Sequence, residues 1–544
     1  MKPSIDYRPT KRGRLPIVSS MVYLPRSHVR NIPELKKYLT VEYNPNVDDQ
    51  DGEIEYIRLY DTRTHKGYIG LPRHFAMEQL RKRLRNAFDH TIKPSKKFKY
   101  PANIKPRDKQ QAEFMTDLAK AVKEYGLGPV DFTAKAKTGS GKTVSLLKTI
   151  SDLGIGPVLF LVHINSLKRQ WVGSKKKGNG IKFFFGKKWA KKNVGIVQQD
   201  VCDYKGKPIV IGMLPSIARR DYGKDFYNYF SAVFWDEVHK SAAPLLSKSL
   251  MLFPAAIRGG VTATPRKGKL ARVIGTHLGK PSILSEQEVM APNVIRVKLQ
   301  PKKPTNLNTY SKYTVLTALT KWDARQDLLR KIIQKKGYDN GRQVLGLSDR
   351  TAQLYDLKQR LIKAGVPEKE IGLYVGSYET GNYIIRVKRP HSSRFIKYKN
   401  FTFPTRHKAK KYIEKQELPE GTEYDIAPHI HTPSIKELER ISKKCSIVLA
   451  TYGIFAVGVD IARLDMGVEC SPRGNVVQAL GRVLRILKGK LTPIWFCIDD
   501  VLYTQSSSIG PKEPIGDFID ASKARTASYR EQNAKISRTS VKIK

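Results

Sequence analysis

The stretch from Ala136 to Thr143 reads Ala-Lys-Thr-Gly-Ser-Gly-Lys-Thr, which has the residue types and spacing of a phosphate-binding loop. A glycine-rich loop that leads into a helix presents several backbone N–H groups to a triphosphate. Lys142 can reach the β and γ phosphate oxygens, and the Thr143 hydroxyl can bind Mg²⁺. We therefore expect ATP hydrolysis, with nucleotide contacts from Lys137, Thr138, Gly139, Ser140, Gly141, Lys142 and Thr143.

Taken alone, this loop is also compatible with an ordinary glycine-rich turn, because Ala136 stands where the pattern has its first glycine. The flanking residues favour phosphate binding. Val130–Ala134 reads as a short strand that enters the loop, and Val144–Ile150 carries apolar residues at helical spacing. Strand, loop and helix therefore occur in the required order.

Two adjacent carboxylates, Asp236 and Glu237, follow the apolar run Ala232–Trp235. Such a pair suits a nucleotide site, because one carboxylate can hold Mg²⁺ while the other orients and activates the attacking water. We assign Asp236 to the metal ion, together with Thr143, and Glu237 to the water. An Asp-Glu pair after a strand is also common as a loop or helix cap. Its position after a phosphate-binding loop, at a domain-sized separation, favours the catalytic interpretation.

The elements that must position these residues are buried parallel strands. Pro157–His163 and Pro208–Gly212 are continuous apolar runs of the kind found in strands that are covered on both faces. Ligands bind at the carboxyl ends of such strands in open α/β sheets. A second series of strands alternates with helices and lacks a phosphate-binding loop: Asn293–Leu299, Gln343–Ser348, Ile371–Gly376 and Ser446–Thr451. The predicted fold class is therefore α/β, with two parallel-sheet domains.

The chain has 544 residues and a formal net charge of +50, from 99 Lys and Arg against 49 Asp and Glu. This length predicts two large domains with an accessory unit. The charge favours a nucleic-acid partner over a merely solvated basic surface, because such an excess repels itself without a polyanion. The 4 cysteines lack metal-ligand spacing, and no apolar run is long enough for a membrane span. We expect a soluble cytoplasmic protein without a signal peptide or transmembrane segment, in the host cytoplasm if it is viral.

The residues Asp236-Glu237-Val238-His239 match the DExH form of the second motif of superfamily 2 helicases. Other segments resemble further motifs of that superfamily, in the same order along the chain. They are Arg107-x-x-Gln110 of the adenine-binding element, Asn165–Trp171 of motif Ia, Thr262–Pro265 of motif III, residues 343–348 and 371–376 of motifs IV and IVa, Thr451 and Gly458–Asp460 of motif V, and Gln478–Arg485 of motif VI. A tetrapeptide is weak by itself, but the order over about residues 104 to 500 is specific.

The resemblance implies two RecA-like domains that use ATP and Mg²⁺. It implies nucleotide contacts from Arg107, Gln110, Gly458 and Asp460, and nucleic-acid contacts from Asn165, Lys168, Gln170, Trp171, Thr262, Thr264 and Thr451. Gln478, Arg482 and Arg485 would complete the ATP site from the second domain. Arg482 and Arg485 are three residues apart, which places them on one face of the predicted helix. A pair of solvated arginines is the alternative for that face.

Four parts are predicted: an N-terminal accessory domain (1–100), a first RecA-like domain (101–288), a second one (289–505) and a basic tail (506–544). Residues 79–88 read as a helix that bears Arg81, Lys82, Arg83 and Arg85. This basic helix predicts that the accessory domain contacts DNA, with a structural lid as the alternative. The tail has little apolar content, so we expect it to become ordered only on binding.

An insertion at about residues 377–434 interrupts the second predicted domain. Its cations are interleaved with aromatic residues, a composition that suits phosphate contacts and base stacking. The expected nucleic-acid contacts are Arg386, Lys388, Arg389, Arg394, Lys397 and Lys399. Alternating apolar and basic residues are equally typical of a half-buried hairpin whose aromatic rings pack on the motor. Strand separation and simple packing therefore both stay open.

The Asp-Glu-Val-His sequence, the Leu-x-x-Gln-Trp of motif Ia and residues Gly70-Leu71-Pro72-Arg73 most resemble phage UvsW-type recombination helicases and related helicases of large DNA viruses. This implies a monomer that acts on branched DNA, sequence-independently, in junction migration and fork remodelling during recombination, repair and replication. The alternatives are a DEAD-box RNA helicase, which has Asp where His239 stands, and the motor subunit of a restriction complex, for which no nuclease constellation is evident. A binding module with a dead ATP site is disfavoured by the intact motif residues.

Overall fold

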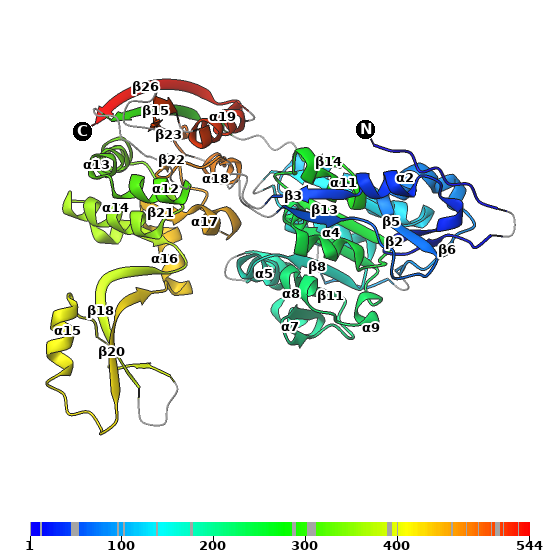
Figure 1. The fold of residues 1–544 in the computed structure, drawn as a ribbon, viewed down its shortest axis with the longest axis horizontal. Helices are drawn as coiled ribbons and strands as arrows, with labels where there is room; N and C mark the ends of the chain where they lie inside the picture. The colour runs from blue at the N-terminus through cyan, green and yellow to red at the C-terminus, as the bar shows by residue number, and fades with distance from the viewer. Residues whose placement is uncertain are drawn as a thin grey trace. The chain divides into compact units, whose positions relative to one another are not determined.

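The structure, a computed structural model, describes residues 2–10, 13–44, 54–94, 97–101, 104–137, 140–174, 178–285, 290–301, 312–388, 394–399, 401–458, 461–474, 476–487, 489–501, 503–505, 512–514, 516–530 and 532–543. The chain divides into two compact units, Met1–Glu288 and Val289–Lys544 (Figure 1). Within those ranges, no helix has the length and apolar character needed to cross a bilayer. The four cysteines are free thiols, of which Cys202 alone is exposed.

An eight-stranded sheet forms the centre of the first unit. Neighbouring strands pair in parallel, except that the edge strand β10 pairs antiparallel with β9. In spatial order they are β10 (Val201–Cys202), β9 (Val194–Gln198), β11 (Ile209–Met213), β8 (Val158–Val162), β12 (Ala232–Asp236), β13 (Ile257–Thr262), β7 (Val130–Ala136) and β14 (Pro281–Ser285). Successive side chains of β8 enter opposite layers: Leu159 joins one hydrophobic cluster, whereas Phe160 stacks on Trp171.

Helices connect these strands and cover the sheet. They are α3 (Lys109–Lys123), α4 (Lys142–Leu153), α5 (Asn165–Val172), α6 (Gly180–Phe184), α7 (Lys187–Asn193), α8 (Leu214–Arg219), α9 (Lys224–Tyr227), α10 (Pro244–Ser247) and α11 (Ala271–Leu278). The alternation of parallel strands and helices confirms the predicted α/β class.

The N-terminal residues are built onto this first sheet and share its core. They form a four-stranded sheet, the hairpin β3/β4 and two helices: β5 (Tyr68–Pro72), β2 (Met21–Pro25), β1 (Ile17–Val18), β6 (Phe88–Asp89), β3 (Thr40–Tyr43), β4 (Glu55–Arg58), α1 (Ile32–Tyr38) and α2 (Arg73–Leu80). Val22 and Leu24 belong to the same buried cluster as Leu159 and Trp235. The N-terminal residues are therefore packed against the first sheet rather than separated from it by a linker.

The helix predicted at 79–88 is wrong in its placement. The α-helix ends at Leu80, and Arg81–Leu84 form a 3-10 turn before β6 begins at Phe88. The helix starts earlier because Phe75, Ala76 and Leu80 bury one face of it in the shared core. The cations Arg81, Lys82, Arg83 and Arg85 remain exposed beyond its end.

A buried ionic cluster joins the N-terminal residues to the sheet. Asp131 of β7 accepts from two guanidiniums at 2.7 Å, those of Arg73 and Arg258. Arg73 also donates to the Ala255 carbonyl at 2.7 Å, and Arg258 donates to the Ser20 carbonyl at 2.7 Å. Burial alone would raise the pKa of Asp131, but Arg258 and Arg73 outweigh it and hold this pKa well below its ordinary value. Arg73 belongs to the segment 70–73 that resembles the phage helicases, and these contacts give it a structural role.

A seven-stranded, wholly parallel sheet forms the centre of the second unit. Its strands, in spatial order, are β17 (Ile371–Tyr374), β21 (Ile447–Thr451), β16 (Val344–Ser348), β22 (Met466–Glu469), β23 (Ile494–Asp500), β15 (Asn293–Pro301) and β26 (Lys535–Ile543). The helices are α12 (Lys312–Lys321), α13 (Asp323–Lys331), α14 (Thr351–Lys363), α16 (Ile435–Lys444), α17 (Tyr452–Gly458), α18 (Val477–Val483) and α19 (Gly516–Arg530). A short hairpin, β24 (Tyr503–Gln505) with β25 (Lys512–Pro514), precedes α19. Both units are RecA-like parallel-sheet domains, as predicted.

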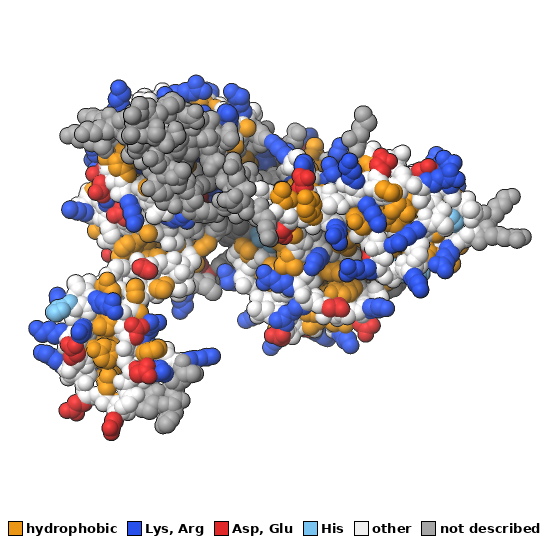
Figure 2. Space-filling view, viewed as in Figure 1, with side chains coloured by type: hydrophobic (Ala, Val, Ile, Leu, Met, Phe, Trp, Pro, Cys, Tyr) orange, Lys and Arg blue, Asp and Glu red, His pale blue; other side chains and the backbone are white. Residues whose placement is uncertain are grey.

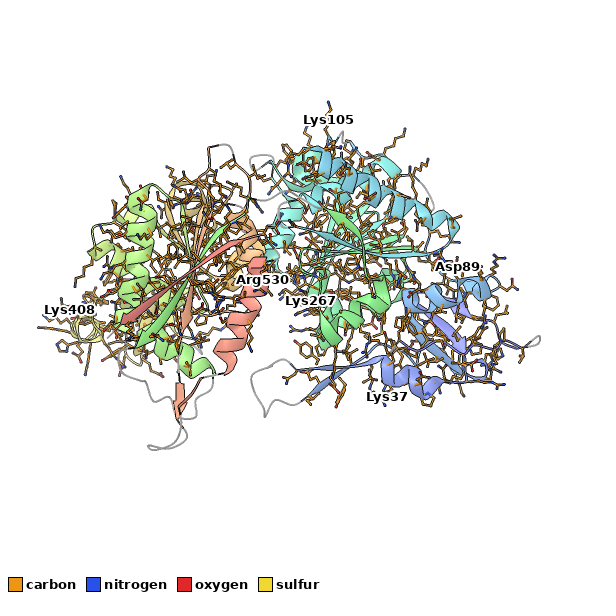
Figure 3. All side chains as sticks on the ribbon, turned by 90° about the horizontal axis from the view of Figure 1, so that it is seen from above. Lys37, Asp89, Lys105, Lys267, Lys408 and Arg530 are labelled. Atoms are coloured by element: carbon orange, nitrogen blue, oxygen red, sulfur yellow. The ribbon has the colours of Figure 1, made fainter. Side chains whose placement is uncertain are left out.

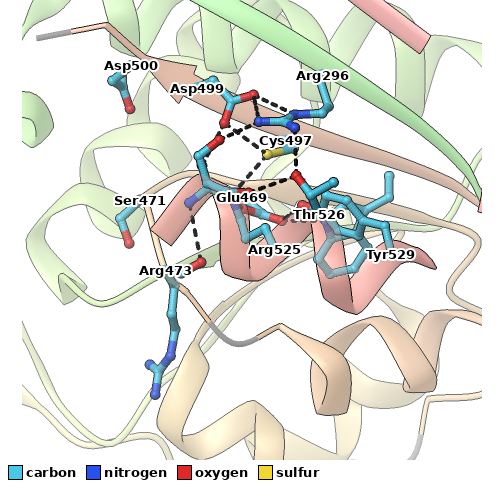
Figure 4. A network of polar contacts seen from close by, with 12 residues as sticks. Arg296, Glu469, Ser471, Arg473, Cys497, Asp499, Asp500, Arg525, Thr526 and Tyr529 are labelled. Carbon is cyan, nitrogen blue, oxygen red and sulfur yellow. Dashed lines mark hydrogen bonds and ion pairs between the residues drawn. The ribbon is translucent and has the colours of Figure 1, made fainter. Parts of the chain in front are cut away.

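The expectation that the C-terminal tail orders only on binding is wrong for residues 516–543. Strand β26 pairs in parallel with β15 along its whole length, and α19 inserts Arg525 and Tyr529 into the unit's interior. Figure 4 shows the result: Glu469 accepts from the Tyr529 hydroxyl, and Arg525 pairs with Asp499 at 2.8 Å. Glu469 also accepts from the Trp495 indole at 2.6 Å. A few buried side chains therefore fix a segment whose mean composition is polar.

The insertion is a small antiparallel sheet with one helix, visible in yellow in Figure 1. Strand β18 (Tyr378–Lys388) lies between β19 (Ile396–Lys397) and β20 (Glu423–His431), and α15 (Arg406–Ile413) packs on the sheet. Its own core contains Ile385, Val387, Ala409, Ile413 and Ile426, with Tyr383, Tyr398, Phe403 and Tyr412 packed against it. Most of its aromatic rings therefore pack within the insertion itself, which differs from both interpretations of the sequence.

A candidate nucleotide site at the carboxyl edge of the first sheet

The predicted phosphate-binding loop links β7 to α4. Gly141 has a φ of 84° and precedes the first turn of α4, which begins at Lys142. This left-handed backbone suits glycine, and a Cβ there would lie 2.0 Å from the Gln111 amide nitrogen. The buried Ser140 hydroxyl has no hydrogen-bond partner among the described residues. Lys137 and Thr143 are half-buried beside it, while Thr138 and Gly139 lie outside the described residues.

Gln111 attaches the upstream segment to this loop. Its amide donates to the Ser140 carbonyl at 3.1 Å, and its side-chain oxygen accepts from the Arg107 N–H at 2.8 Å. Asp108 caps α3 by accepting from the Gln111 N–H at 2.8 Å. The sequence pattern selected Gln110, which is half-buried, and missed Gln111. Helical spacing with Phe114, Met115 and Leu118 would have marked Gln111 as an inward-facing position.

The carboxylates that follow β12 lie next to the loop lysine. Lys142 Nζ is 3.4 Å from Glu237 Oε1 and 3.4 Å from the Ala136 carbonyl oxygen. Glu237 adopts a left-handed backbone with a φ of 53°, a conformation that costs energy for a residue with a side chain. Strain of this kind is concentrated where function requires a fixed geometry. Two segments 95 positions apart, by the numbers of Lys142 and Glu237, thus meet at one point.

The local electrostatics shift the pKa values of the two carboxyl groups in opposite directions. Burial and the neighbouring Glu237 raise the pKa of Asp236 to about 6. Burial also acts on Glu237, but Lys142 and His239 outweigh it and hold the pKa of Glu237 well below its ordinary value. Burial lowers the pKa of His239, which favours its neutral imidazole form. Glu237 is therefore a carboxylate that can accept a proton or a hydrogen bond from water.

Trp171, predicted to touch nucleic acid, instead contacts the predicted metal ligand. It is 1% exposed, stacks on Phe160 with ring centroids 4.1 Å apart, and donates its indole N–H to Asp236 Oδ2 at 2.8 Å. The prediction failed because this aromatic residue lies on the buried face of α5, with Leu167. Asn165 and Gln170 lie on the exposed face of the same helix, so their contact with nucleic acid stays a prediction.

Thr262 is also too deeply buried to touch nucleic acid directly. Its hydroxyl lies 2.8 Å from His239 Nδ1 and donates to Glu237 Oε2 at 3.3 Å. It accepts from the Thr264 N–H at 3.1 Å, which orders the start of the loop after β13. Thr264 is half-buried, and Lys168 of α5 is half-buried with its ammonium group on Gln198. Motif III is thus hydrogen-bonded to motif II through His239.

The donor set fits a magnesium nucleotide. Asp236 and the Thr143 hydroxyl offer two oxygen ligands of the kind that Mg²⁺ binds together with phosphate oxygens and water. Among the described residues, no group of three or more His, Cys, Asp and Glu forms a separate metal cage. The loop N–H groups at the start of α4, beside Lys142, suit the phosphates. The residues present therefore match a cation that arrives with its nucleotide.

The predicted residues of the second unit lie along the carboxyl edge of its own sheet. Thr451 ends β21 and is half-buried, and Gly458 ends α17; Asp460 and the Gln478 side chain lie outside what the structure describes. Arg482 is buried with its guanidinium 5.6 Å from the Phe455 ring. The shared helical face is not observed, because α18 ends at Val483 and Arg485 lies beyond the end of the helix. Lys490 closes this end by donating to the carbonyls of Val483 (2.7 Å) and Arg485 (2.9 Å).

Two predicted nucleic-acid contacts of the insertion have acidic partners across the strands. Arg386 pairs with Asp425, and Lys388 pairs with Glu423 at 3.0 Å. Lys399 donates to the Tyr412 hydroxyl at 3.2 Å. Arg394 and Lys397 are exposed, and Arg389 lies outside the described residues.

One protein-family model matches part of the first unit. Residues 103–267 match the family described as type III restriction enzyme, res subunit. A relative from Acanthamoeba polyphaga mimivirus, named "Putative ATP-dependent RNA helicase L396", is 22% identical over 489 residues, covering 86% of this chain and 78% of that protein.

Solved structures also match this chain at low sequence identity. T4 UvsW is 15% identical, with 99% of this chain and 100% of that chain covered and a TM-score of 0.32. The DEAH/RHA helicase HrpB of Escherichia coli is 14% identical, with 71% and 42% covered and a TM-score of 0.41. Dbp5 of S. cerevisiae, bound to RNA, is 10% identical, with 80% and 94% covered and a TM-score of 0.41. The family match and the mimivirus relative, with the ordered motifs, confirm that the chain is a superfamily 2 helicase and an ATP-dependent hydrolase.

Proposed function

We propose that this chain is a DNA helicase or translocase that acts on branched DNA, migrating junctions and remodelling forks in recombination, repair and replication. The observation that carries the ATP-driven part is the contact between Lys142 and Glu237, which joins the phosphate-binding loop to the predicted catalytic base. Residues 101–288 would bind ATP, and the second parallel-sheet domain would move against them. The enzyme would act as a monomer, because one chain carries all the motifs.

In the proposed reaction, each side chain of the first site has one task. Mg²⁺ bound with ATP would neutralise the phosphate charge. Asp236 and Thr143 would hold it, while Lys142 would turn from Glu237 towards the phosphates. Glu237, freed from that ion pair, would orient the attacking water and accept its proton.

A hydrogen-bonded path supports coupling between this chemistry and nucleic acid. Trp171 links the metal ligand Asp236 to α5, whose exposed face carries Asn165 and Gln170. Thr262 links Glu237 and His239 to the loop that contains Thr264. Trp171 and Thr262 would thus act through hydrogen bonds rather than by touching the strand. A shift of α5 or of the motif III loop on nucleic acid would move the two carboxylates.

Closure of the two domains would supply the remaining groups. Gln478, Arg482 and Arg485 would reach the nucleotide from the second domain, with Gly458 and Asp460 beside them. Cations that arrive only on closure stabilise charge that develops on the γ-phosphoryl group, which couples hydrolysis to movement. Contacts to sugar and phosphate carry no sequence information, so movement would be sequence-independent and weakened by salt.

DNA is preferred to RNA because His239 stands where DEAD-box RNA helicases have Asp, and because the motif Ia sequence resembles that of phage recombination helicases. RNA is the second candidate substrate, since the mimivirus relative carries the name of an RNA helicase. A restriction-type translocase is a third, since the matching family is described by a restriction subunit.

The test compares stimulation of ATP hydrolysis by single-stranded DNA, single-stranded RNA, a forked duplex and a four-way junction of equal nucleotide content. Branched DNA should stimulate most, and the junction should be resolved only with ATP. Glu237→Gln should bind every substrate and process none. Stimulation by RNA alone would move the assignment to the second candidate, and processing without ATP would refute a motor function.

A further inference from the structure

The basic residues of the insertion fall into two groups that the sequence did not separate. One group lies on the strands, where Arg386 pairs with Asp425 and Lys388 pairs with Glu423. Cross-strand partners point to the same side of a sheet, so Arg386 and Lys388 each have a neutralising neighbour on this face, to which Lys397 adds one further cation. The strands therefore offer little net positive charge to a phosphate backbone.

The second group lies on α15. Ala409 and Ile413 are four residues apart and face the core of the insertion, with Tyr412 packed beside them, so the opposite side of the helix faces outward. Five exposed side chains of the helix are basic or imidazole groups, followed by an exposed lysine just beyond it: Arg406, His407, Lys408, Lys410, Lys411 and Lys415. Lys408 is labelled at the outer edge of the insertion in Figure 3, and Figure 2 shows Lys and Arg side chains gathered there.

This face is neutralised much less than the strand face. Lys410 has an acidic partner, Glu414, at 3.7 Å. Arg406, Lys408, Lys411 and Lys415 have none within the described part of the chain. The difference between the two faces is a matter of pairing, since both carry several cations.

The placement of these cations works against the helix itself. Thr405 caps the helix by accepting from the Lys408 N–H at 3.2 Å, yet Arg406, His407 and Lys408 occupy the first turn, where the helix dipole disfavours positive charge. Arg406 and Lys410 place like charges four residues apart on the helix, which destabilises it. Helix stability and solubility therefore do not explain this pattern, whereas a polyanionic partner does.

We propose that the outer face of α15, the α15 face, binds the sugar-phosphate backbone of a nucleic-acid arm. This inference rests on the proposed function, because it assumes that the motor works on nucleic acid. Lys408 and Lys411 are three residues apart on the helix, and Lys415 follows just past its end at Ile413, so the three lysines extend one exposed stripe of positive charge. Such a stripe spans successive phosphates and makes no contact that depends on base sequence.

The experiment measures the dissociation constant of the full-length protein for a fluorescent forked duplex over a range of salt concentrations. The variant is Lys408→Glu with Lys411→Glu and Lys415→Glu. The matched control is Lys331→Glu with Lys336→Glu and Lys363→Glu, which changes the charge equally on exposed helical positions outside the insertion. Hydrolysis of ATP without nucleic acid is measured for each protein.

The α15 variant should bind at least about 10-fold more weakly than the control at moderate salt. The slope of log K against log salt should fall by about 3, one for each lost phosphate contact. Its basal hydrolysis should equal that of the wild type, which shows that the motor is folded. Replacement of the same lysines by glutamine should give a smaller loss in the same direction, because it removes the attraction without adding repulsion.

Equal binding by the variant and its control would overturn the role of the α15 face and leave the proposed function intact. Failure of the wild type to bind or respond to any nucleic acid would overturn both.

Discussion

The two parallel sheets use buried charged residues in different ways. At the edge of the first sheet, Asp236 has a raised pKa, Glu237 has a left-handed backbone, and the buried Ser140 hydroxyl lacks a partner among the described residues. In the second sheet, Glu469 accepts two hydrogen bonds and faces Arg525, which also pairs with Asp499. The folds match, yet the first set has a strained backbone and a hydroxyl unpaired within the described part of the chain, whereas the second is joined by ion pairs and hydrogen bonds, with burial raising the pKa of Glu469.

This difference distinguishes buried charged residues that take part in catalysis from those that stabilise the fold. Buried polar groups that are fully paired hold a fold together, whereas perturbed or strained groups in one place mark a site that binds or reacts. By this criterion the first sheet carries the chemistry, and the buried network of the second sheet attaches the C-terminal helix. The two sets should therefore respond differently to substitution.

The largest expected effect is on stability in the second unit. Arg525→Ala leaves Glu469 buried without its cation, while Asp499 keeps Arg296 as a partner, and breaking a buried pair in this way costs about 3–5 kcal/mol. The midpoint of urea denaturation should fall to a lower urea concentration. Arg530→Ala, at the exposed end of the same helix, should unfold like the wild type. Equal midpoints for the two variants would show that the network does not hold α19.

At the first sheet, we expect an effect of similar size on the rate of ATP hydrolysis. Lys142→Ala should lower kcat for ATP by about 10²- to 10³-fold, because it removes a preorganised cation from the phosphates. The denaturation midpoint should change little. Lys148→Ala lies on the same helix with an exposed partner, Asp152, and should keep full activity. Substantial hydrolysis by Lys142→Ala would place the nucleotide elsewhere.

Trp171→Phe should have a smaller effect, also on hydrolysis. Phenylalanine keeps the stack on Phe160 but loses the N–H that orients Asp236, and the loss of such outer partners costs about 10-fold or more at metal sites. The Mg²⁺ concentration for half-maximal activity should rise while DNA affinity stays constant. Trp189→Phe, in another aromatic contact of the first unit, is the control. Weaker DNA binding with unchanged Mg²⁺ dependence would restore Trp171 to the nucleic-acid surface.

The smallest expected effect is a change of stability with pH, caused by the structural carboxylate Asp131 of the first unit. The pKa of Asp131 is lower in the folded protein than its unfolded value of about 4, so its contribution is complete above that pH and is lost as the pH falls. Each pH unit below about 4 should remove about 1.4 kcal/mol of stability. Asp131→Asn, which lacks this group, should be less stable at pH 7, and its difference from the wild type should shrink between pH 5 and 3. A constant difference would contradict the ionic role.

The sequence predicted what depends on local pattern. Apolar runs placed four strands of each sheet within one or two residues, since a buried parallel strand is continuous in composition. The phosphate-binding loop and the two carboxylates were predicted as neighbours because both follow strands of one sheet.

The errors have a common physical origin, which is burial set by tertiary packing. Trp171 and Thr262 share motifs with exposed residues, and only the fold shows that they face inward to Asp236 and Glu237. The C-terminal segment is polar on average, but its few buried side chains dock it on β15. The pairing of Arg386 with Asp425 depends on strand register, which composition does not define.

The most direct test of the central claim, that hydrolysis at the first sheet requires arginines of the second, is single-turnover ATP hydrolysis with saturating nucleotide and forked DNA. We predict that Arg482→Ala and Arg485→Ala each lower the rate by about 10³-fold, as loss of an arginine finger does, while nucleotide binding and the denaturation midpoint are unchanged. Hydrolysis at the wild-type rate by both variants would contradict a two-domain motor.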